Sequence, residues 1–300
     1  MGRISVVIVI AAGLAAGCGG SSPSSGRTLD ALMKRAGPDV PVIAGAADFQ
    51  PGVVRFPFLV LRYDGQAVER PTAEVWLATG RGREPFAHTV ARLESIDVPG
   101  RSAAGANVHR LYVAHLSIPR PGRYWLVAEP TGARIQALGS FDVSAHSASL
   151  AVGSRAPRSD TPTLATAKGD VARLTTRQPP DLGLLRYSVA ASLAAHLPFV
   201  VTFASPAFCD SRTCGPIVSV VDAVRRRFSL AKARFIHVEA YRDLEPRNGF
   251  NRWVRQWGLP SQPWTFVVGS DGRVRAKFEG PLSAAELVAA VREVLRIDSR

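Results

Sequence analysis

The sequence predicts a two-domain protein in which an N-terminal all-β sandwich precedes a C-terminal α/β domain, and three observations support this fold class. Residues 38–146 carry short alternating runs of apolar and polar residues, separated by turn signals such as Asp64-Gly65 and Pro121-Gly122. Residues 183–300 alternate apolar strand-like runs with helical patterns, which is typical of α/β domains. Residues 147–182 are rich in proline, serine and threonine, which indicates a linker and approach segment.

The first 18 residues resemble the signal peptide of a bacterial lipoprotein. An apolar segment over residues 4–16 leads to Leu14-Ala15-Ala16-Gly17-Cys18, and a Gly/Ser-rich stretch follows. The apolar segment is shorter than the roughly 20 residues of a transmembrane helix, but it fits a signal peptide. The resemblance implies lipidation of Cys18 and a flexible tether over residues 19–37. An ordinary secretory signal is the alternative, because Leu14 lies one place farther from Cys18 than in the commonest lipoprotein pattern.

The charge of the chain bears on its partners. The sequence has 37 Lys and Arg against 24 Asp and Glu, a formal net charge of +13. The basic residues are scattered, and the one tight run, Arg225-Arg226-Arg227, lies on a predicted helix where it is expected to face solvent. We therefore expect no nucleic-acid partner and interpret the charge as attraction to anionic lipid or wall polymer. The oligomeric state is not predicted.

The predicted sandwich contains five clear strand-like runs and no long amphipathic helix. The stretch from Pro121 to Leu126 resembles the entry to a late strand of immunoglobulin-like domains, which implies a tyrosine-corner role for Tyr124. His88, His109 and His115 lack the close spacing of metal ligands, so we expect no metal site. We interpret the domain as an adhesion, spacing or docking module. The five runs span residues 53–61, 73–78, 109–118, 124–128 and 135–143.

Cys209 and Cys214 are the candidate reactive residues of the second domain. An apolar, β-branched run over residues 199–203 predicts a buried strand, and apolar residues recur at helical spacing from Pro216 onward. The two thiols therefore lie between a strand and a helix N-terminus, where the helix dipole favours a thiolate. An exported compartment permits a disulfide between them, and with Cys18 lipidated no thiol is left over.

The order of elements around these cysteines resembles the thioredoxin fold over nearly all of residues 183–297. Residues 153–157 resemble the segment that often precedes such domains, and residues 257–266 resemble the thioredoxin segment in which a cis-proline precedes a strand. The resemblance implies a cis bond between Gln262 and Pro263, with the backbone of Gln262 beside the cysteines to pair with an extended substrate chain. The predicted helices and strands follow in the order helix 184–196, strand 199–203, helix from 216, strand 233–240, helix 250–258, strands 264–268 and 273–278, and a final helix capped by Ser283 and Glu286.

The sequence departs from the thioredoxin pattern in two places. Its cysteines have C-x4-C spacing, and an offset of five residues in one α-helix gives about 7.5 Å of rise, more than the roughly 7 Å Cα limit of a disulfide. Cys209 must then fold back from the loop. Two registers are open: Cys209 takes the place of the family's first cysteine, or Cys214 takes it with Ile217 in the second place. The position of Gly215-Pro216 favours Cys214 at the helix cap. In addition, Thr202 occupies the place of a buried acid that assists proton transfer in thioredoxins.

These features predict a membrane-anchored, extracytoplasmic thiol–disulfide oxidoreductase that uses Cys209 and Cys214 on thiols or disulfides of exported proteins. Related copper-delivering proteins combine C-x3-C with a distant histidine. Here the spacing differs and His237 is the candidate, so we expect no metal or other cofactor. The alternative is a non-catalytic, lipid-anchored envelope protein that serves as a binding or scaffold module and whose disulfide is structural.

Overall fold

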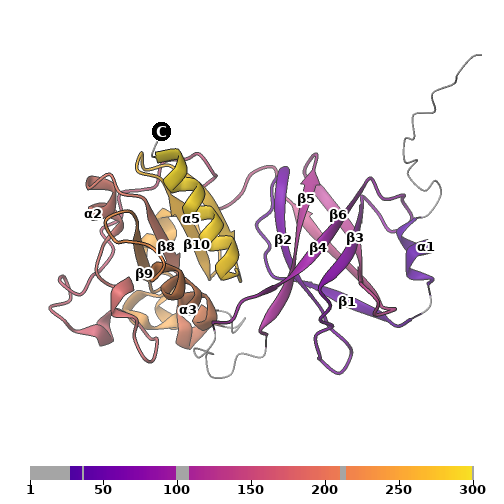
Figure 1. The fold of residues 1–300 in the computed structure, drawn as a ribbon, viewed down its shortest axis with the longest axis horizontal. Helices are drawn as coiled ribbons and strands as arrows, with labels where there is room; N and C mark the ends of the chain where they lie inside the picture. The colour runs from indigo at the N-terminus through magenta and orange to yellow at the C-terminus, as the bar shows by residue number, and fades with distance from the viewer. Residues whose placement is uncertain (1–27, 36, 99–107, 210–213, 299–300) are drawn as a thin grey trace, which may run out of the picture.

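The structure of the chain is a computed structural model. It describes residues 28–35, 37–98, 108–209 and 214–298 and contains a β-barrel beside a smaller sheet covered by helices (Figure 1). The predicted signal peptide, the lipidation site Cys18 and most of the predicted tether lie outside the described residues. Within the described ranges, no helix is both long and apolar enough to cross a membrane.

The first part of the chain forms a closed barrel with the strand order β1-β2-β5-β4-β3-β6-β7. Its core is rich in aromatic side chains, and Phe56, Phe58, Tyr112 and Tyr124 are almost completely buried. Burial of these large rings removes much apolar surface from water and so stabilises this part of the molecule. The strands are β1 (Asp39–Ala44), β2 (Gly52–Val60), β3 (Thr72–Ala78), β4 (Ala87–Ser95), β5 (Arg110–Ile118), β6 (Gly122–Pro130) and β7 (Gln136–Val143).

Strand β1 closes the barrel because it changes its partner halfway along. Its first half pairs in parallel with β7, and its second half pairs antiparallel with β2. Gly139 of β7 permits the close approach, since a Cβ atom there would lie 2.8 Å from the Cβ of Val42. The predicted all-β character of this part is confirmed, but the strands form one closed sheet, and a sandwich of two separate sheets is not shown. Apolar alternation predicts which side chains face inward, but it does not specify which strands pair.

The five predicted strand-like runs correspond to β2, β3, β5, β6 and β7. The sequence pattern does not reveal β1 or β4. β4 has one fully buried side chain, Ala91, and β1 contains Pro41, which weakens the strand signal. The Tyr124 hydroxyl donates a hydrogen bond of 2.8 Å to the Arg120 carbonyl, as a tyrosine corner requires. The immunoglobulin-like arrangement of two separate sheets is nevertheless not shown, because the seven strands are linked into one closed barrel.

The described end of the predicted tether packs on the barrel. Helix α1 (Leu29–Met33) follows Thr28, whose hydroxyl accepts the N–H of Ala31 as an N-cap. Leu29 and Leu32 are buried in a cluster with Val127 of β6. This helical turn therefore fixes the chain to the barrel before the first strand begins.

The second part of the chain forms a four-stranded sheet with the order β11-β10-β8-β9. β8 and β9 are parallel, whereas β10 runs antiparallel to both of its neighbours. The predicted order of strand, helix, strand, helix, hairpin and helix is confirmed. Its elements are α2 (Val189–Ala194), β8 (Phe199–Phe203), α3 (Cys214–Arg225), β9 (Arg234–Val238), α4 (Arg252–Gln256), β10 (Trp264–Val268), β11 (Val274–Glu279) and α5 (Ala284–Asp298), with 3₁₀ turns η1 (Val171–Arg173), η2 (Leu182–Leu184), η3 (Pro206–Phe208), η4 (Arg242–Leu244) and η5 (Pro246–Asn248).

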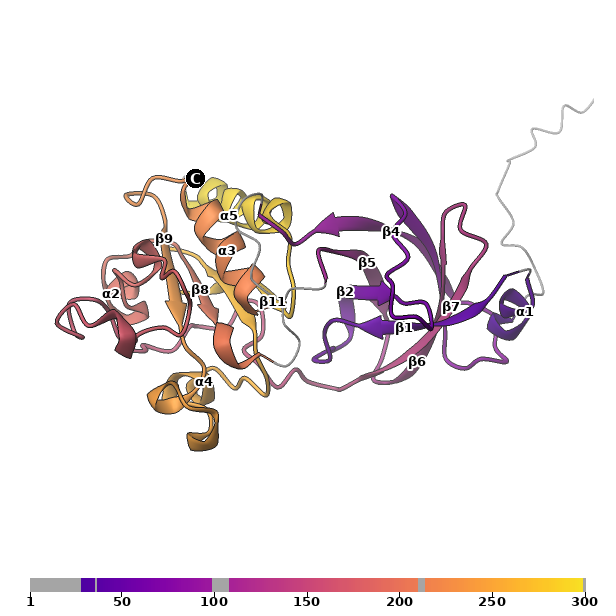
Figure 2. The same ribbon diagram turned by 90° about the horizontal axis from the view of Figure 1, so that it is seen from below.

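The two faces of this sheet have separate cores. Helices α3 and α5 cover one face, where Ile217 and Val291 are buried, and α4 lies on the other face with Trp257 (Figure 2). The predicted capping box of α5 is confirmed, because Ser283 and Glu286 each accept the backbone N–H of the other through their side chains. These packed layers hold the carboxyl end of β8 in a fixed position.

The chain just before the sheet runs along β11. Gly153 donates its N–H to the carbonyl of Val274, Val274 donates to Ser154, and Ala156 donates to Gly272, at 2.8–2.9 Å. The predicted entry segment, residues 153–157, thus forms hydrogen bonds along the outer edge of the sheet, at the start of β11.

A charged pair joins the barrel to the sheet. Arg55 of β2 contacts Glu286 of α5 with a nitrogen–oxygen distance of 2.6 Å, and both side chains are largely buried. Burial alone would raise the pKa of Glu286, but the bonds and charge of Arg55, together with hydrogen bonds from Ser283, hold this pKa below its usual value. The folded state therefore favours the ionised form of Glu286.

Backbone groups also meet where the barrel contacts the sheet. The Glu279 carboxylate, at the end of β11, accepts the N–H groups of Ala47 and Asp48 at 2.7 Å each. Gly280 has φ of +69°, and a Cβ atom at this position would lie 2.0 Å from the carbonyl oxygen of Gly45. This position therefore requires glycine for both its conformation and its close contact. The loop before β2 is fixed against the end of β11.

Candidate functional site

The sequence around the two cysteines folds as a buried strand, a short loop and a buried helix. All five residues of β8 are buried, η3 follows, and α3 begins at Cys214. Ile217, Val221 and Val224 fix α3 against the sheet, because each is completely buried. The cysteines consequently lie just after the carboxyl end of the central strand β8, and α3 is fixed there by its packing in the core.

Cys209 and Cys214 form a disulfide bond, with a Cα–Cα distance of 6.0 Å. Cys214 is the first residue of α3, and Cys209 lies in the loop after η3 and folds back over it. The predicted pairing is confirmed, as is the placement of Cys214 at the start of the helix. The wider spacing of the cysteines is thus accommodated outside the helix.

The two sulfur atoms have different surroundings. Cys214 is completely buried, whereas Cys209 is partly exposed. The Cys209 sulfur accepts the backbone N–H of Cys214 at 3.2 Å, so it lies directly at the positive end of α3. A thiolate at Cys209 would be stabilised there, and of the two cysteines only Cys209 is partly exposed, as the cysteine attacked by an incoming thiolate must be. The geometry therefore distinguishes the cysteines, which the sequence does not.

Gln262 and Pro263 lie beside the cysteine loop, and the predicted cis bond between them is confirmed. The Gln262 side chain accepts the N–H of Ser205 at 2.5 Å and donates to the carbonyl of Phe208 at 2.7 Å. Among the described residues, the backbone N–H and carbonyl of Gln262 form no hydrogen bond. The side chain therefore holds the cysteine loop, and the backbone is left for the predicted pairing with a substrate chain.

Thr202 occupies a buried position beneath the cysteine-bearing helix. It is completely buried, and its hydroxyl is 3.0 Å from the hydroxyl of Thr265 on β10. The hydrogen bond satisfies both hydroxyls without a charge. Two uncharged side chains, Thr202 and Thr265, thus occupy the position where thioredoxins have a buried acid.

A buried carboxylate that the sequence does not single out lies near the cysteine loop. Glu239 follows β9 and is 4% exposed. Its Oε1 accepts the hydroxyls of Thr175 and Thr176 and the N–H of Thr176. The Thr176 oxygen in turn accepts the N–H of Ala207, two residues before Cys209. Because these groups come from distant parts of the chain, no local pattern reveals them.

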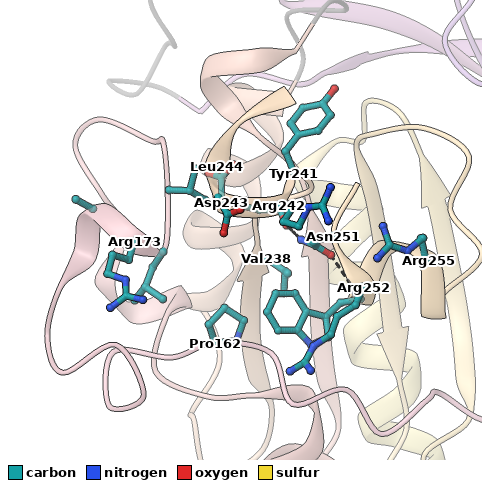
Figure 3. A pocket seen from close by; sticks show the side chains of 14 residues that line it. Pro162, Arg173, Val238, Tyr241, Arg242, Asp243, Leu244, Asn251, Arg252 and Arg255 are labelled. Atoms are coloured by element: carbon teal, nitrogen blue, oxygen red, sulfur yellow. Dashed lines mark hydrogen bonds between the residues drawn. The ribbon is translucent and has the colours of Figure 1, made fainter. Parts of the chain in front are cut away.

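The surface beside Glu239 is hollowed by a pocket of about 640 Å³ (Figure 3). Arg173, Asp243 and Trp253 line it, so both charges and an aromatic ring are present. Tyr241 belongs to its rim, and its ring points away from the pocket. Neither cysteine lines the pocket, which is therefore separate from the disulfide.

The histidines weighed as metal ligands have other contacts. His237 is buried, with Nε2 2.9 Å from the Ala204 carbonyl, and His109 pairs with Asp97. In the part of the chain that the structure describes, no group of three or more His, Cys, Asp or Glu residues is placed to hold a metal ion. These contacts give the two histidines structural partners.

Comparison with solved structures finds a similarity to a thioredoxin-family protein. No family model matches the chain, and no curated protein matches it. A crystal structure described as a thiol:disulfide interchange protein, a thioredoxin family protein from Chlorobium tepidum TLS, is similar with 20% sequence identity and a TM-score of 0.28. The match covers 35% of this chain and 84% of that chain.

Proposed function

We propose that the protein is a thiol–disulfide oxidoreductase of the thioredoxin-like type. The observation that carries the proposal is the asymmetry of the disulfide: Cys209 is partly exposed and its sulfur accepts the first N–H of α3, whereas Cys214 is completely buried. Exchange needs one accessible sulfur with a stabilised thiolate and a second sulfur within reach to resolve the mixed disulfide. The strand order and the cis-proline beside the cysteines are what such a fold requires.

The reaction follows from this asymmetry. A substrate thiolate attacks the Cys209 sulfur, a mixed disulfide forms, and Cys214 leaves as a thiolate. A second substrate thiolate then attacks the substrate sulfur of the mixed disulfide and releases Cys209 as a thiolate. The substrate is oxidised by two electrons, the protein is reduced by two, and the reverse sequence reduces a substrate disulfide. The backbone of Gln262 pairs with the extended substrate chain during the exchange.

We further propose that the protein acts outside the cytoplasm, anchored through a lipid on Cys18. Support comes from the sequence: the apolar segment, the small residues before Cys18 and the Gly/Ser-rich stretch after it. Its clients are then thiols or disulfides of exported proteins, because disulfides persist in oxidising compartments. Metabolic labelling with a fatty acid tests the anchor, and the label must disappear in Cys18→Ser.

The cysteine variants test the catalytic proposal. We expect the wild type and Cys18→Ser to catalyse reduction of insulin or oxidation of a dithiol peptide, and Cys209→Ala to lose all turnover. Cys214→Ala should accumulate a mixed disulfide on Cys209, because the resolving thiol is missing, and intact-mass analysis detects it. Turnover that persists without Cys209 would sink the proposal.

A structural role for the disulfide is the second candidate, and the complete burial of Cys214 in the core favours it. In that case the protein is a non-catalytic envelope scaffold or binding protein, and the bond acts as a clip. The reduction potential separates the two candidates. A value below about −300 mV indicates a structural bond, and a higher value indicates an exchangeable one.

A further inference from the structure

We infer that the surface beside Cys209 docks an acidic, extended segment of the client polypeptide. The docking surface consists of an aromatic strip, formed by Phe208, Tyr241 and Phe250, and two flanking arginines, Arg242 and Arg255. This inference rests on the proposed function and adds a substrate class to it.

The aromatic strip starts at Phe208, the residue before the partly exposed Cys209. The Phe208 side chain is 38% exposed, and its ring lies edge-on to Tyr241 with centroids 6.5 Å apart. The rings of Tyr241 and Phe250 are stacked with centroids 5.3 Å apart. An aromatic surface of this kind offers contact area at little cost in side-chain entropy, as in known docking surfaces.

The backbone holds the strip in a defined shape before any partner binds. Tyr241 and Phe250 form an antiparallel bridge, with hydrogen bonds from Arg242 N–H to the Gly249 carbonyl and from Asn251 N–H to the Ala240 carbonyl. The strip is therefore preorganised, which reduces the entropy cost of docking.

The flanking arginines make the surface selective for negative charge. Arg242 and Arg255 are exposed, and each guanidinium donates to a backbone carbonyl, that of Asn248 and of Phe250 respectively. Among the described residues neither forms an ion pair, whereas the nearby Arg252 is paired with Asp160. Two uncompensated guanidinium groups beside an aromatic strip complement carboxylates on a client chain, because guanidinium groups bind carboxylates through paired hydrogen bonds.

Gln262 links the docking surface to the place where the client chain is proposed to bind. Its amide donates to the carbonyl of Phe208, so the backbone predicted to pair with substrate and the start of the aromatic strip share one anchor. A chain paired with Gln262 and exchanging with Cys209 has its next residues beside the strip. Acidic residues near the client cysteine therefore meet the two arginines.

The test compares three disulfide-containing peptides that differ at the residues flanking cysteine, which are Asp and Glu, Asn and Gln, or Lys. We expect the wild type to have a kcat/KM about threefold to tenfold higher for the acidic peptide than for the neutral one, as two exposed ion pairs allow. Salt should reduce this preference. The double variant Arg242→Gln/Arg255→Gln should lose the preference, and Arg242→Lys/Arg255→Lys should retain part of it.

Arg247→Gln is the matched control, because Arg247 is exposed on the same segment but pairs with Glu245. It should keep the full acidic preference. Wild-type turnover of the neutral disulfide of 2-mercaptoethanol tests the proposed function separately. If that turnover is present and the three peptides react equally, the inference is overturned and the function stands. If no disulfide is turned over, the inference is overturned with the function.

Discussion

The side chain of Gln262 joins two loops that are far apart in the sequence. Its amide bonds to Ser205 and Phe208, 57 and 54 residues away, and both partners belong to the segment that leads to Cys209. Ser205 is completely buried, so removal of the glutamine side chain takes away the acceptor of a buried N–H. The position of Cys209 thus depends on one amide group on the opposite loop.

We expect Gln262→Ala to lower the free energy of unfolding by about 1–3 kcal/mol, because a buried N–H then lacks an acceptor. Gln262→Glu is the matched control. It keeps an acceptor for Ser205 but sets a second acceptor against the Phe208 carbonyl, so the two variants separate the contributions of the two hydrogen bonds. Urea unfolding followed by circular dichroism measures both. Equal midpoints for the alanine variant and the wild type would contradict this account.

At the scale of single residues, local patterns predict part of the site. Cys209, Cys214 and Pro263 are visible because their spacing and neighbours are distinctive. The Gln262 side chain and Glu239 are not visible, because their roles depend on partners that only the fold brings near. The sequence also does not show that Cys209 is partly exposed and Cys214 buried, because the burial of single residues in and beside a loop depends on the fold.

At the scale of elements, the turn between β11 and α5 is a point of close contact between the barrel and the sheet. Gly280 lies in this turn with its backbone against the carbonyl of Gly45. The loop around Gly45 leads into β2, so any shift of this turn moves the barrel and the sheet relative to each other. Two elements far apart in the chain are therefore fixed by one small residue.

Gly280→Ala should destabilise the protein by clearly more than the approximately 1–2 kcal/mol that a left-handed conformation costs any residue with a Cβ atom. Gly249→Ala is the control, because Gly249 has a similar φ of +71° and a Cβ atom added there would meet no other atom within 4 Å. The difference between the two unfolding free energies isolates the contact with Gly45. Equal losses would mean that this close approach contributes nothing.

The elements differ in how far the sequence predicts them. β2, β6 and the strands of the smaller sheet carry strong apolar patterns, and each is where the pattern places it. β1 and β4 are not predicted, because β1 contains Pro41 and β4 has a single fully buried side chain. The predicted helix over residues 184–196 is shorter in the structure, where η2 and α2 divide it. Closure of the barrel depends on β1 pairing with two strands, which no local pattern encodes.

At the scale of the whole molecule, the barrel is tied to the site. Glu279 accepts backbone N–H groups of Ala47 and Asp48, and its other oxygen accepts the hydroxyl of Ser261 at 3.2 Å. Ser261 immediately precedes Gln262. The barrel, which the sequence suggests as a separate docking module, thus contacts the loop that holds the cysteine segment.

The ion pair between Arg55 and Glu286 predicts a pH dependence of stability. Because the folded pKa of Glu286 lies below its unfolded value of 4.5, the pair contributes stability above that pH and loses it as the pH falls through the folded pKa. Glu286→Gln should cost about 2 kcal/mol at pH 7 and progressively less below pH 4.5. Urea unfolding from pH 7 to pH 3 measures both proteins, and parallel curves would contradict the prediction.

The partner change of β1 and the hydrogen bonds of Gly153, Ser154 and Ala156 to β11 have a common consequence for self-association. A free strand edge is a template on which another chain can add a strand, and natural proteins cover or abolish such edges. Here closure leaves the barrel without an edge, and the entry segment shields the start of β11. The barrel and the start of β11 are thereby protected from edge-to-edge aggregation by the backbone of the chain itself.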